Sequence, residues 1–438
     1  MATAAANQVS AERRAVVVGG VRTPFAKAFA ELMRLDTIAL GTAAVRGLLD
    51  RYPVAPSDID ALIWGSVIIP SQSPNVGREI VLDAKLGVGV EAMTVTRACT
   101  SGLQAITLAA ASIERGEADV VIAGGSDSTS NAEVKLPQKL VQATAPFVLG
   151  KASPSALLGA LAQLAPFSEL LPRAPKIAER TTGKTMGEAA EAMARLAEIS
   201  RQAQDEFAAL SHQRAARAIA AQRFAAEIVA IDDGRGRRLQ ADTLVRPDTS
   251  VDKLGRLKPV FAADGTLTAG NSSPLTDGAA AVLLMSEGKA RALGLRPLAR
   301  FRSWAYVGVD PADQLLIGPA LAMPKALARA GYELADMDLV DMHEAFAAQV
   351  LCVLKALGSD SFARLRLGRE RAFGQVDPER LNVHGGSIAL GHPFAATGAR
   401  MVTTMANELA QTGRRRALLG ICAAGGLGAA AVLENASD

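Results

Sequence analysis

Short runs of apolar and β-branched residues alternate along this chain with segments in which apolar residues recur every three or four positions. The first pattern predicts buried strands and the second predicts amphipathic helices. The first part of the chain is predicted to hold strands at 14–20, 60–66, 93–96 and 119–123, separated by helices at 36–51, 75–86 and 102–115. This alternation predicts an α/β fold with a mostly parallel sheet covered on both faces.

The second half of the chain repeats features of the first half in the same order. The hexapeptide Gly-Ala-Ala-Ala-Val-Leu occurs at 278–283 and again at 428–433. The pattern Asp-x4-Gly at 36–41 recurs at 313–318. No single match is strong, but their shared order indicates a duplicated α/β unit.

The duplication also locates an insertion. Gly428 follows Gly426 by two residues, whereas about 150 residues separate the corresponding Gly125 and Gly278. Inserts of this length usually cover a binding site, and a decorative surface domain is the alternative. The predicted organisation is an N-terminal half at 13–128 completed by 274–294, an inserted loop domain at 129–273, and a C-terminal half at 295–438.

Composition narrows the class of protein. The 438 residues include 47 Lys and Arg against 44 Asp and Glu, and a net charge of +3 argues against a nucleic-acid partner. Three cysteines are too few for a disulfide framework, and with the four histidines they match no zinc-site spacing. The N-terminus lacks a secretory pattern, and glycines interrupt the apolar stretch at 417–433, so we expect a cytoplasmic protein.

Cys99 lies where a predicted strand ends and a predicted helix begins. Ligands of open α/β sheets bind at the carboxyl ends of strands, and the N–H groups of a helix N-terminus favour a thiolate. Cys99 is therefore a candidate nucleophile, with a small buried hydrophobe as the alternative interpretation.

His392 follows a glycine-rich stretch at 384–391. The helix predicted at 102–115 has a counterpart that includes Gly398, so His392 stands near the position equivalent to Cys99 in the other half. If the two halves face each other, the imidazole can take the proton of the thiol. Taken alone, His392 would be interpreted as a structural loop residue.

Two further candidates lie at the carboxyl ends of predicted strands. Cys422 begins Cys-Ala-Ala-Gly-Gly-Leu-Gly, a turn whose backbone N–H groups could face an oxyanion. His343 begins His-Glu-Ala-Phe. A dinucleotide fingerprint at 426–431 is rejected because no helix can follow it, and a phosphate loop at Lys184 is rejected because its first glycine is missing.

Together these motifs resemble the thiolase family over nearly the whole chain. Cys99 matches the family's acylated cysteine, His392 its activating histidine, and Cys422 its acid/base cysteine. His343 stands at the first position of the family's Asn-Glu-Ala-Phe motif. The resemblance implies the duplicated thiolase fold, with two βαβαβαββ-type halves in five αβαβα layers and a long inserted loop domain.

The resemblance also implies binding residues. Met186 lies in a segment similar to the family's Met-Gly-x-x-Ala-Glu, and Ser273 matches a serine beside the pantetheine of coenzyme A. His384 is a further histidine expected near the substrate. The backbone N–H groups of Cys99 and Ala424 are implied as an oxyanion site. No metal and no redox cofactor is implied, because coenzyme A is a substrate.

Departures from the family pattern point to a subgroup. His343 replaces the usual Asn, and Ala424 replaces a Gly, which is tolerable only if the backbone angles there do not demand glycine. These features and the long insert are similar to the β subunit of the fatty-acid-oxidation trifunctional complex and its bacterial counterparts. The implied activity is 3-ketoacyl-CoA thiolase, an acyltransferase that cleaves medium and long 3-ketoacyl-CoA in β-oxidation through an acyl-cysteine.

Three alternatives remain at this point. An acetoacetyl-CoA-forming biosynthetic thiolase uses the same residues, and only the long insert favours degradation. A ketoacyl synthase shares the fold but lacks the second cysteine that Cys422 supplies. A non-catalytic acyl-CoA or lipid carrier should have lost Cys99 or His392, and both are present.

Expected partners also come from the resemblance, which implies a homodimer or a dimer of dimers acting on acyl-CoA and CoA. The apolar stretch at 146–168 is expected to dock a hydratase/dehydrogenase α subunit or to make a peripheral membrane contact, with a self-packed cover as the alternative. Cys352 is expected to be a buried helix residue, and His212 to have no role at the site.

Overall fold

The computed structural model describes residues 9–134, 136–150, 153, 156, 159–160 and 178–437. The chain divides into a larger unit, Met1–Asn131 with Glu179–Asp438, and a smaller unit, Ala132–Ala178. In the smaller unit the structure describes helix α4 (Gln138–Val148). Most of the stretch at 146–168, expected to dock a partner, lies outside the described residues. The domain boundaries at 129 and 273 stay predictions.

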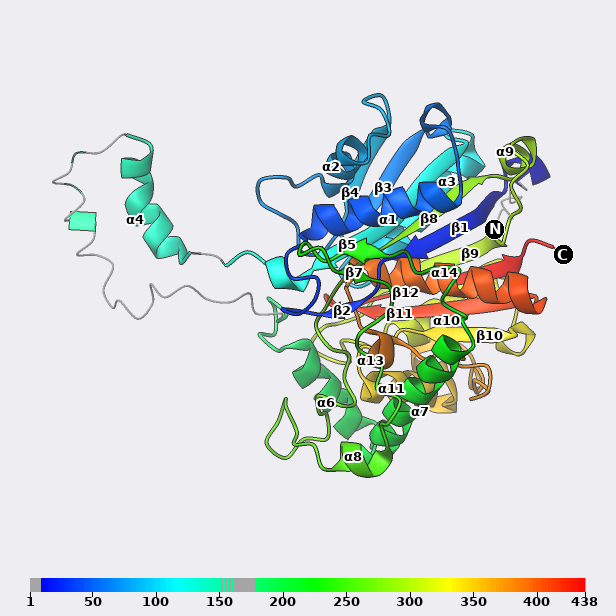
Figure 1. Cartoon of the computed structure of the whole chain (residues 1–438). Coiled ribbons are helices and arrows are strands. Elements are labelled where there is room, and N and C mark those ends of the chain that lie inside the picture. The colour runs from blue at the N-terminus through cyan, green and yellow to red at the C-terminus, as the bar shows by residue number, and fades with distance from the viewer. Residues whose placement is uncertain are drawn as a thin grey trace, which may run out of the picture. The chain divides into compact units, whose positions relative to one another are not determined.

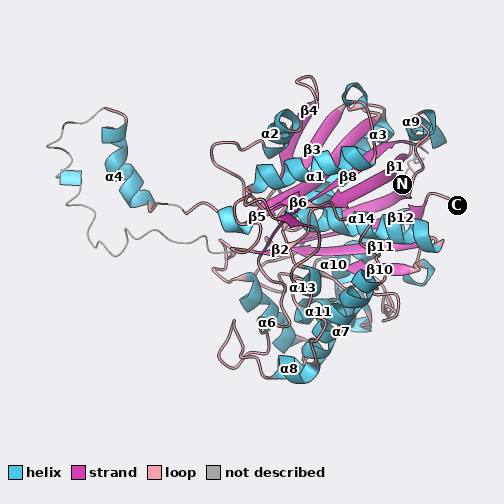
Figure 2. Cartoon of the chain, in the orientation of Figure 1, coloured by secondary structure: helices cyan, strands magenta, loops and turns pink. Residues whose placement is uncertain are grey.

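The larger unit is built on a ten-stranded sheet, shown in Figures 1 and 2. The first half supplies β1 (Ala15–Arg22), β2 (Ala26–Lys27), β3 (Ala61–Gly65), β4 (Glu91–Val95), β5 (Val120–Ser128) and β8 (Thr276–Ser286). The second half supplies β9 (Ala299–Gly308), β10 (Leu339–Met342), β11 (Arg416–Ala423) and β12 (Leu427–Asn435). A separate two-stranded sheet pairs β6 (Ile231–Asp232) with β7 (Arg238–Leu239).

The strand order confirms the duplication. It runs β4-β3-β5-β8-β1 through the first half and continues β9-β12-β11-β10 through the second. In each half one strand, β8 or β12, is antiparallel to both of its neighbours, while the outer strands run parallel. The halves are joined edge to edge where β1 meets β9 at Val16 and Val17. The strands β3-β5-β8-β1 therefore correspond in order to β10-β11-β12-β9, and β4 is an additional edge strand of the first half.

The helices complete the layers. They are α1 (Thr37–Arg51), α2 (Val76–Asp83), α3 (Ser101–Arg115), α6 (Met186–Leu196), α7 (Arg201–Ala220), α8 (Val251–Gly255), α9 (Glu287–Ala292), α10 (Pro319–Ala330), α11 (Ala347–Leu357), α12 (Asp360–Phe362), α13 (Ser387–Leu390) and α14 (Ala395–Thr412). Asp36 caps α1 by accepting from the Ala39 N–H, and the left-handed Gly116 and Gly413 end α3 and α14. No helix in the described residues is long and apolar enough to cross a membrane.

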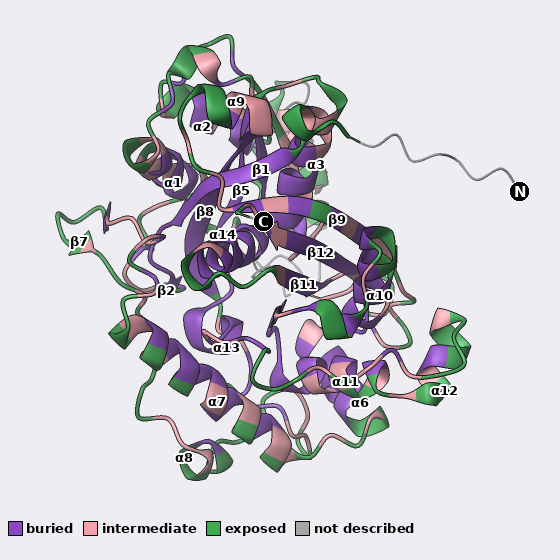
Figure 3. Ribbon diagram, turned by 90° about the vertical axis from the view of Figure 1, so that its right-hand side faces the viewer, coloured by how far each residue is buried: buried purple, intermediate pink, exposed green. Residues whose placement is uncertain are grey.

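Three apolar clusters hold five layers together. Helices α1 and α2 cover the outer face of the first-half strands, and α10 and α11 cover the outer face of the second-half strands. Helices α3 and α14 lie between the two sets of strands, where Ile106 and Val402 share one cluster with Val121 and Leu419. In Figure 3 the central strands β1, β5 and β8 and most of α14 are buried, whereas β9 is partly exposed. The predicted αβαβα layering is confirmed.

Strand β5 is longer than the strand predicted at 119–123, because it continues through Gly124 and Gly125 to Ser128. The glycine pair was expected to end the strand. Instead it lets a neighbouring backbone approach, since a Cβ on Gly125 would lie 2.5 Å from the carbonyl oxygen of Ala395. Glycine here serves packing rather than a turn.

The central helices α3 and α14 touch at backbone distance. A Cβ on Gly102 would lie 2.1 Å from the Ala395 carbonyl oxygen, and one on Gly398 would lie 2.5 Å from the backbone nitrogen of Leu103. Real Cβ atoms do not come this close to backbone atoms, so both positions require glycine. This contact brings the N-terminal ends of the two helices together.

The Gly102→Ala variant should therefore be less stable than the natural chain by about 1–3 kcal/mol, because the backbone of α14 must move to admit the methyl group. Gly255→Ala is the control, since Gly255 also lies in a helix but a Cβ there would meet nothing within 4 Å. Urea unfolding followed by circular dichroism measures the difference. Equal stability of the two variants would contradict the close-contact account.

Candidate active site

A strained turn presents Cys99 between β4 and α3. Ala98 has a φ of +46°, which non-glycine residues rarely adopt. The Ser101 side chain holds this turn, because its Oγ donates to the Ala98 carbonyl at 2.6 Å and accepts from the Arg97 N–H at 2.7 Å. Cys99 thus stands just before the first turn of α3.

Cys99 lies beside two histidines from the other half of the chain. Its sulfur and one ring nitrogen from each of His343 and His392 all lie within 4.8 Å of one another. The two imidazole centroids are 4.1 Å apart. His343 directly follows β10, and His392 lies between α13 and α14. The prediction that the duplication brings His392 to Cys99 is confirmed.

Each imidazole is held at Nδ1 by a hydroxyl group. His343 Nδ1 lies 2.9 Å from Ser387 Oγ, and His392 Nδ1 lies 2.7 Å from Thr397 Oγ1. Both Nε2 atoms are buried and have no hydrogen-bond partner among the described residues. The Nε2 atoms are therefore the nitrogens free to act on a substrate.

Both imidazoles are uncharged in the resting site. Burial, together with the charge of Arg400, lowers the pKa of His392 to about 3. Burial, the neighbouring His392 and Arg400 hold the pKa of His343 well below its usual range. Arg400 is itself buried and pairs with Asp341 at 3.2 Å. A neutral histidine can accept a proton, as a general base must.

The Cys99 thiol is protonated in the resting site. Burial raises its pKa to about 12, against the opposing effect of the backbone N–H groups of Ala424 and Cys99, and the charge of Asp127 raises it further. Desolvation thus opposes the thiolate that the helix N-terminus favours, and it is the larger of the two effects. The proton must leave as the sulfur attacks.

Cys422 lies near the end of β11, close enough to Cys99 to interact with it electrostatically. Burial raises its pKa well above the ordinary value, and the nearby Cys99 raises it further. The following turn contains Gly425 and Gly426, with φ of +81° and +66°. Ala424 is not among the described residues with positive φ. The replacement of glycine by Ala424 is therefore compatible with this backbone.

A cavity of about 370 Å³ lies along the segment that leads to His392. Its wall includes Ser273, and the same segment reaches the reaction centre because Leu275 forms a backbone bridge with His392. Most of the lining is apolar, with Lys27, His212 and Arg246 as its basic groups. His212, expected to have no role, therefore lies on the cavity wall.

Sequence reasoning missed these basic residues for a physical reason. Lys27 follows the first strand and Arg246 belongs to the long insert, so no local spacing connects them. His212 Nδ1 accepts from the Arg246 N–H at 3.1 Å, while burial and the Arg246 charge lower its pKa to about 4. His212 is a neutral side chain that holds the Arg246 backbone in place.

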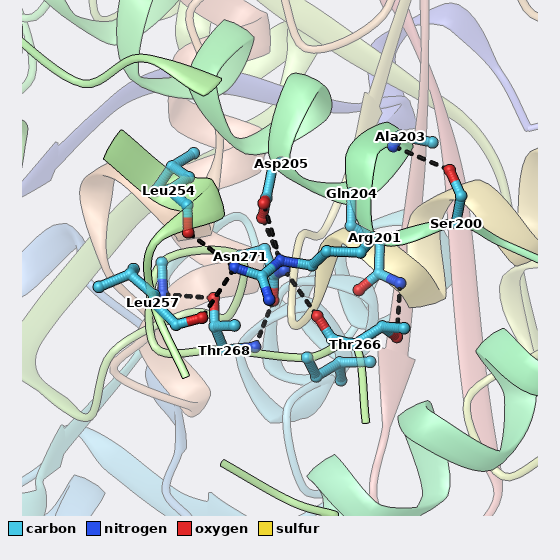
Figure 4. A network of polar contacts seen from close by, with 12 residues as sticks. Ser200, Arg201, Ala203, Gln204, Asp205, Leu254, Leu257, Thr266, Thr268 and Asn271 are labelled. Atoms are coloured by element: carbon cyan, nitrogen blue, oxygen red, sulfur yellow. Dashed lines mark hydrogen bonds and ion pairs between the residues drawn. The ribbon is translucent and has the colours of Figure 1, made fainter. Parts of the chain in front are cut away.

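A polar network fixes the segment that leads into this wall (Figure 4). Asn271 donates to Asp205 at 2.9 Å and accepts from the Thr268 N–H at 2.7 Å. Asp205 also pairs with Arg201 at 2.7 Å, and Arg201 donates to the carbonyls of Leu254 and Leu257. Helix α7 thereby anchors the chain just before Ser272–Leu275.

Two predicted binding residues lie elsewhere. Met186 begins α6 and packs against the core of the second half, and it is not among the residues that line the cavity. His384 Nε2 lies 2.7 Å from Glu408, and its ring packs edge-on against Phe224. His384 is not a member of the Cys99–histidine group. Its role at the substrate stays a prediction.

Within the described part of the chain, Cys99, His343 and His392 form the one group with ligand types and spacing that could hold a metal ion. These residue types suit zinc. The buried charge of Arg400, which lowers the pKa of both histidines, opposes a cation in the same place. The expectation of no metal site stays a prediction.

Comparison with known proteins identifies the family. The family model described as "Thiolase, N-terminal domain" matches residues 15–288, and "Thiolase, C-terminal domain" matches residues 295–435. The chain belongs to the thiolase family. The resemblance inferred from the motifs is thereby confirmed.

Similar thiolases cover almost the whole chain. A 3-ketoacyl-CoA thiolase of Yersinia enterocolitica is 45% identical over 96% of this chain and 97% of its own. One from Pectobacterium atrosepticum is 46% identical over 96% of each chain. Among solved structures, human mitochondrial 3-ketoacyl-CoA thiolase aligns with a TM-score of 0.82 at 30% identity, covering 98% of this chain and 100% of that one. The Bacillus anthracis acetyl-CoA acetyltransferase aligns with a TM-score of 0.82 at 32% identity, covering 97% and 99%.

The turn after Cys422 can be tested by exchanging its small residues. Ala424→Gly should keep activity within a few-fold, because the backbone at 424 needs no glycine. Gly426→Ala should lower stability by about 1–3 kcal/mol and lower activity as well, because its Cβ would lie 2.3 Å from the Val309 carbonyl in a left-handed backbone. Thermal melting and turnover of a 3-ketoacyl-CoA measure both effects. A Gly426→Ala variant that behaves like Ala424→Gly would be evidence against this view of the turn.

Proposed function

We propose that this protein is a 3-ketoacyl-CoA thiolase, which uses CoA to cleave a 3-ketoacyl-CoA into acetyl-CoA and a shortened acyl-CoA. The observation that carries the proposal is the group formed by the half-buried Cys99 and the buried His343 and His392, with Cys422 nearby. It supplies a nucleophile, a base, an oxyanion donor and a second acid/base group. The names of the relatives at 45–46% identity support the same activity.

The first half-reaction acylates Cys99. The sulfur attacks the C3 ketone of the substrate while its proton passes to His392 Nε2, which carries no charge and no other partner in the described chain. The new alkoxide accepts hydrogen bonds from Nε2 of His392 and of His343. When the alkoxide collapses, the C2–C3 bond breaks and Cys422 protonates the leaving carbanion. The products are acetyl-CoA and an acyl thioester on Cys99.

The second half-reaction releases the shortened acyl group. Cys422, now deprotonated, takes the proton of an incoming CoA thiol. The CoA sulfur attacks the Cys99 thioester, and we assign the oxyanion to the backbone N–H groups of Cys99 and Ala424, which also lower the Cys99 pKa. Cys99 leaves as a thiolate and regains its proton from His392. Both cysteines return to their resting state.

The cavity fits the arm of a CoA thioester. Its wall is mainly apolar, as a pantetheine arm and an acyl chain require, and Ser273 lies on it. Lys27 and Arg246 supply positive charge for the phosphate groups of CoA. We assign CoA to this cavity as a substrate and propose no metal or redox cofactor.

The setting of this activity is also a proposal. We place the enzyme in fatty-acid β-oxidation in the cytoplasm, as a homodimer or a dimer of dimers with a hydratase/dehydrogenase α subunit as a further partner. The second candidate is an acetoacetyl-CoA-forming thiolase, which the similarity to the Bacillus anthracis acetyl-CoA acetyltransferase favours. The long insert before β8 favours the degradative function.

Thiolysis of 3-ketoacyl-CoA substrates of four, ten and sixteen carbons separates these candidates. We expect higher kcat/KM for the longer substrates, measured as loss of the 3-ketoacyl absorbance with CoA present. A clear preference for the four-carbon substrate would instead support the acetoacetyl-CoA-forming function. Absence of cleavage at every chain length would overturn the thiolase proposal.

Cysteine variants test the mechanism. Cys99→Ala should lose essentially all thiolysis, because no other group can carry the acyl chain. Cys352→Ala is the matched control, since Cys352 is a buried cysteine of α11 that belongs to the apolar core. Its activity should remain within a few-fold of the natural enzyme. Thiolysis by Cys99→Ala at the natural rate would exclude an acyl-Cys99 intermediate.

A further inference from the structure

A buried chain of polar groups leads to the far side of His343. Ser387 Oγ lies 2.9 Å from His343 Nδ1 and accepts from Arg400 Nη2 at 3.4 Å. Arg400 in turn pairs with Asp341 at 3.2 Å. All four side chains are buried. The chain of contacts therefore runs from Asp341 through Arg400 and Ser387 to His343, away from solvent.

The donors and acceptors in this chain determine which nitrogen of His343 carries the proton. Arg400 can only donate, so Ser387 Oγ must accept from it. The one hydroxyl proton of Ser387 then has a single acceptor among the described residues, which is His343 Nδ1. If Nδ1 instead carried a proton, the Ser387 hydroxyl proton would be buried without an acceptor, which is unfavourable. Nδ1 is therefore the acceptor, and the ring proton lies on Nε2.

We propose that Ser387, oriented by Arg400, is a positioning residue that holds His343 in its Nε2–H form, so that the imidazole donates a hydrogen bond to the substrate alkoxide. The inference rests on the thiolase reaction proposed above and assigns a source for one of its hydrogen bonds. An asparagine amide, usual at this position, always carries N–H donors. A neutral histidine donates from Nε2 only in one of its two tautomers.

The neighbouring histidine has the opposite requirement. His392 must present an unprotonated Nε2 to take the Cys99 proton, so its ring proton must lie on Nδ1. Thr397 Oγ1 lies 2.7 Å from that nitrogen and has a lone pair that can accept from it. Among the described residues, only the hydroxyl group on Ser387 is bonded to an arginine, so a third group fixes the bond direction at His343. At His392 the proposed reaction, rather than a third group, requires the proton on Nδ1.

The backbone of His343 is also fixed. Asn382 accepts from the Met342 N–H at 2.7 Å and donates to the Met342 carbonyl at 2.9 Å. It also donates to Glu344 at 2.7 Å, and the His343 N–H donates to the Gly420 carbonyl at 2.8 Å. The peptide groups around His343 are therefore held, and its tautomer depends on the partner of Nδ1.

The tautomer can be measured directly in the resting protein. The chain contains only four histidines, so labelling histidine with nitrogen-15 gives few imidazole signals. His343→Asn identifies the signals of His343 by their loss. We expect the natural protein to show a protonated Nε2 and an unprotonated Nδ1 at His343. In Ser387→Ala we expect the proton to be shared between both nitrogens or to move to Nδ1.

Kinetics test whether this tautomer matters. Ser387→Ala should lower kcat about tenfold to a hundredfold with a smaller change in KM, because the lost donor acts on the transition state. In the His343→Asn background the same substitution should have little further effect, since no tautomer remains to be set. Ser303→Ala is the control, because Ser303 is also buried but donates to the Ala326 carbonyl. It should change neither kcat nor the His343 signals.

The two readouts separate this inference from the proposed function. A protonated Nδ1 at His343 in the natural protein would overturn the inference whatever the enzyme catalyses. An unchanged tautomer in Ser387→Ala, or effects of the two substitutions on kcat that simply multiply, would also overturn it. If the tautomer responds as expected and no 3-ketoacyl-CoA is cleaved, the proposed function fails and Ser387 still sets the tautomer.

Discussion

The close contact between α3 and α14 is the constraint on which the rest of the structure depends. Each helix follows a segment that carries a reactive side chain, Cys99 before α3 and His392 before α14. Glycines at 102 and 398 let the two helices meet at backbone distance, closer than any residue with a Cβ could allow. Groups from opposite halves of a duplicated chain thereby reach one site. The N-terminal ends of α3 and α14 therefore lie next to the candidate reaction centre.

Burial then decides the electrostatics of that site. The central layer excludes water, so the uncharged forms of the thiols and imidazoles are favoured, and the positive charge of Arg400 reinforces this at both histidines. In the proposed reaction, proton transfer from Cys99 to His392 accompanies attack, because burial disfavours both ions beforehand. The hydroxyl groups of Ser387 and Thr397 contact Nδ1 of the two rings, so that Nε2 of each ring is left without a partner among the described residues.

Equivalent positions in the two halves hold residues with different contacts. Asp127 pairs with Gly278 in the first half, as Cys422 pairs with Gly428 in the second, so the two side chains occupy matching positions. Asp127 accepts from the backbone of Val67, Ile68 and Ala395, and so fastens α14 to the first half. Cys422 lies next to the nucleophile instead. Asp127 therefore joins the two halves, whereas Cys422 lies at the candidate reaction centre.

The sequence by itself determined the strand and helix alternation, the duplication, and the four motifs that hold Cys99, His343, His392 and Cys422. These are local patterns and repeats, so they can be recognised without knowing the fold. The neutral thiol, the extension of β5 through its glycines and the placement of His212 on the cavity wall were decided by tertiary structure. Each depends on burial or on a backbone that arrives from a distant part of the chain. The contacts of His343 with Ser387, and of Ser387 with Arg400, could not be predicted from the sequence either. They form only when packing buries these side chains together and excludes water.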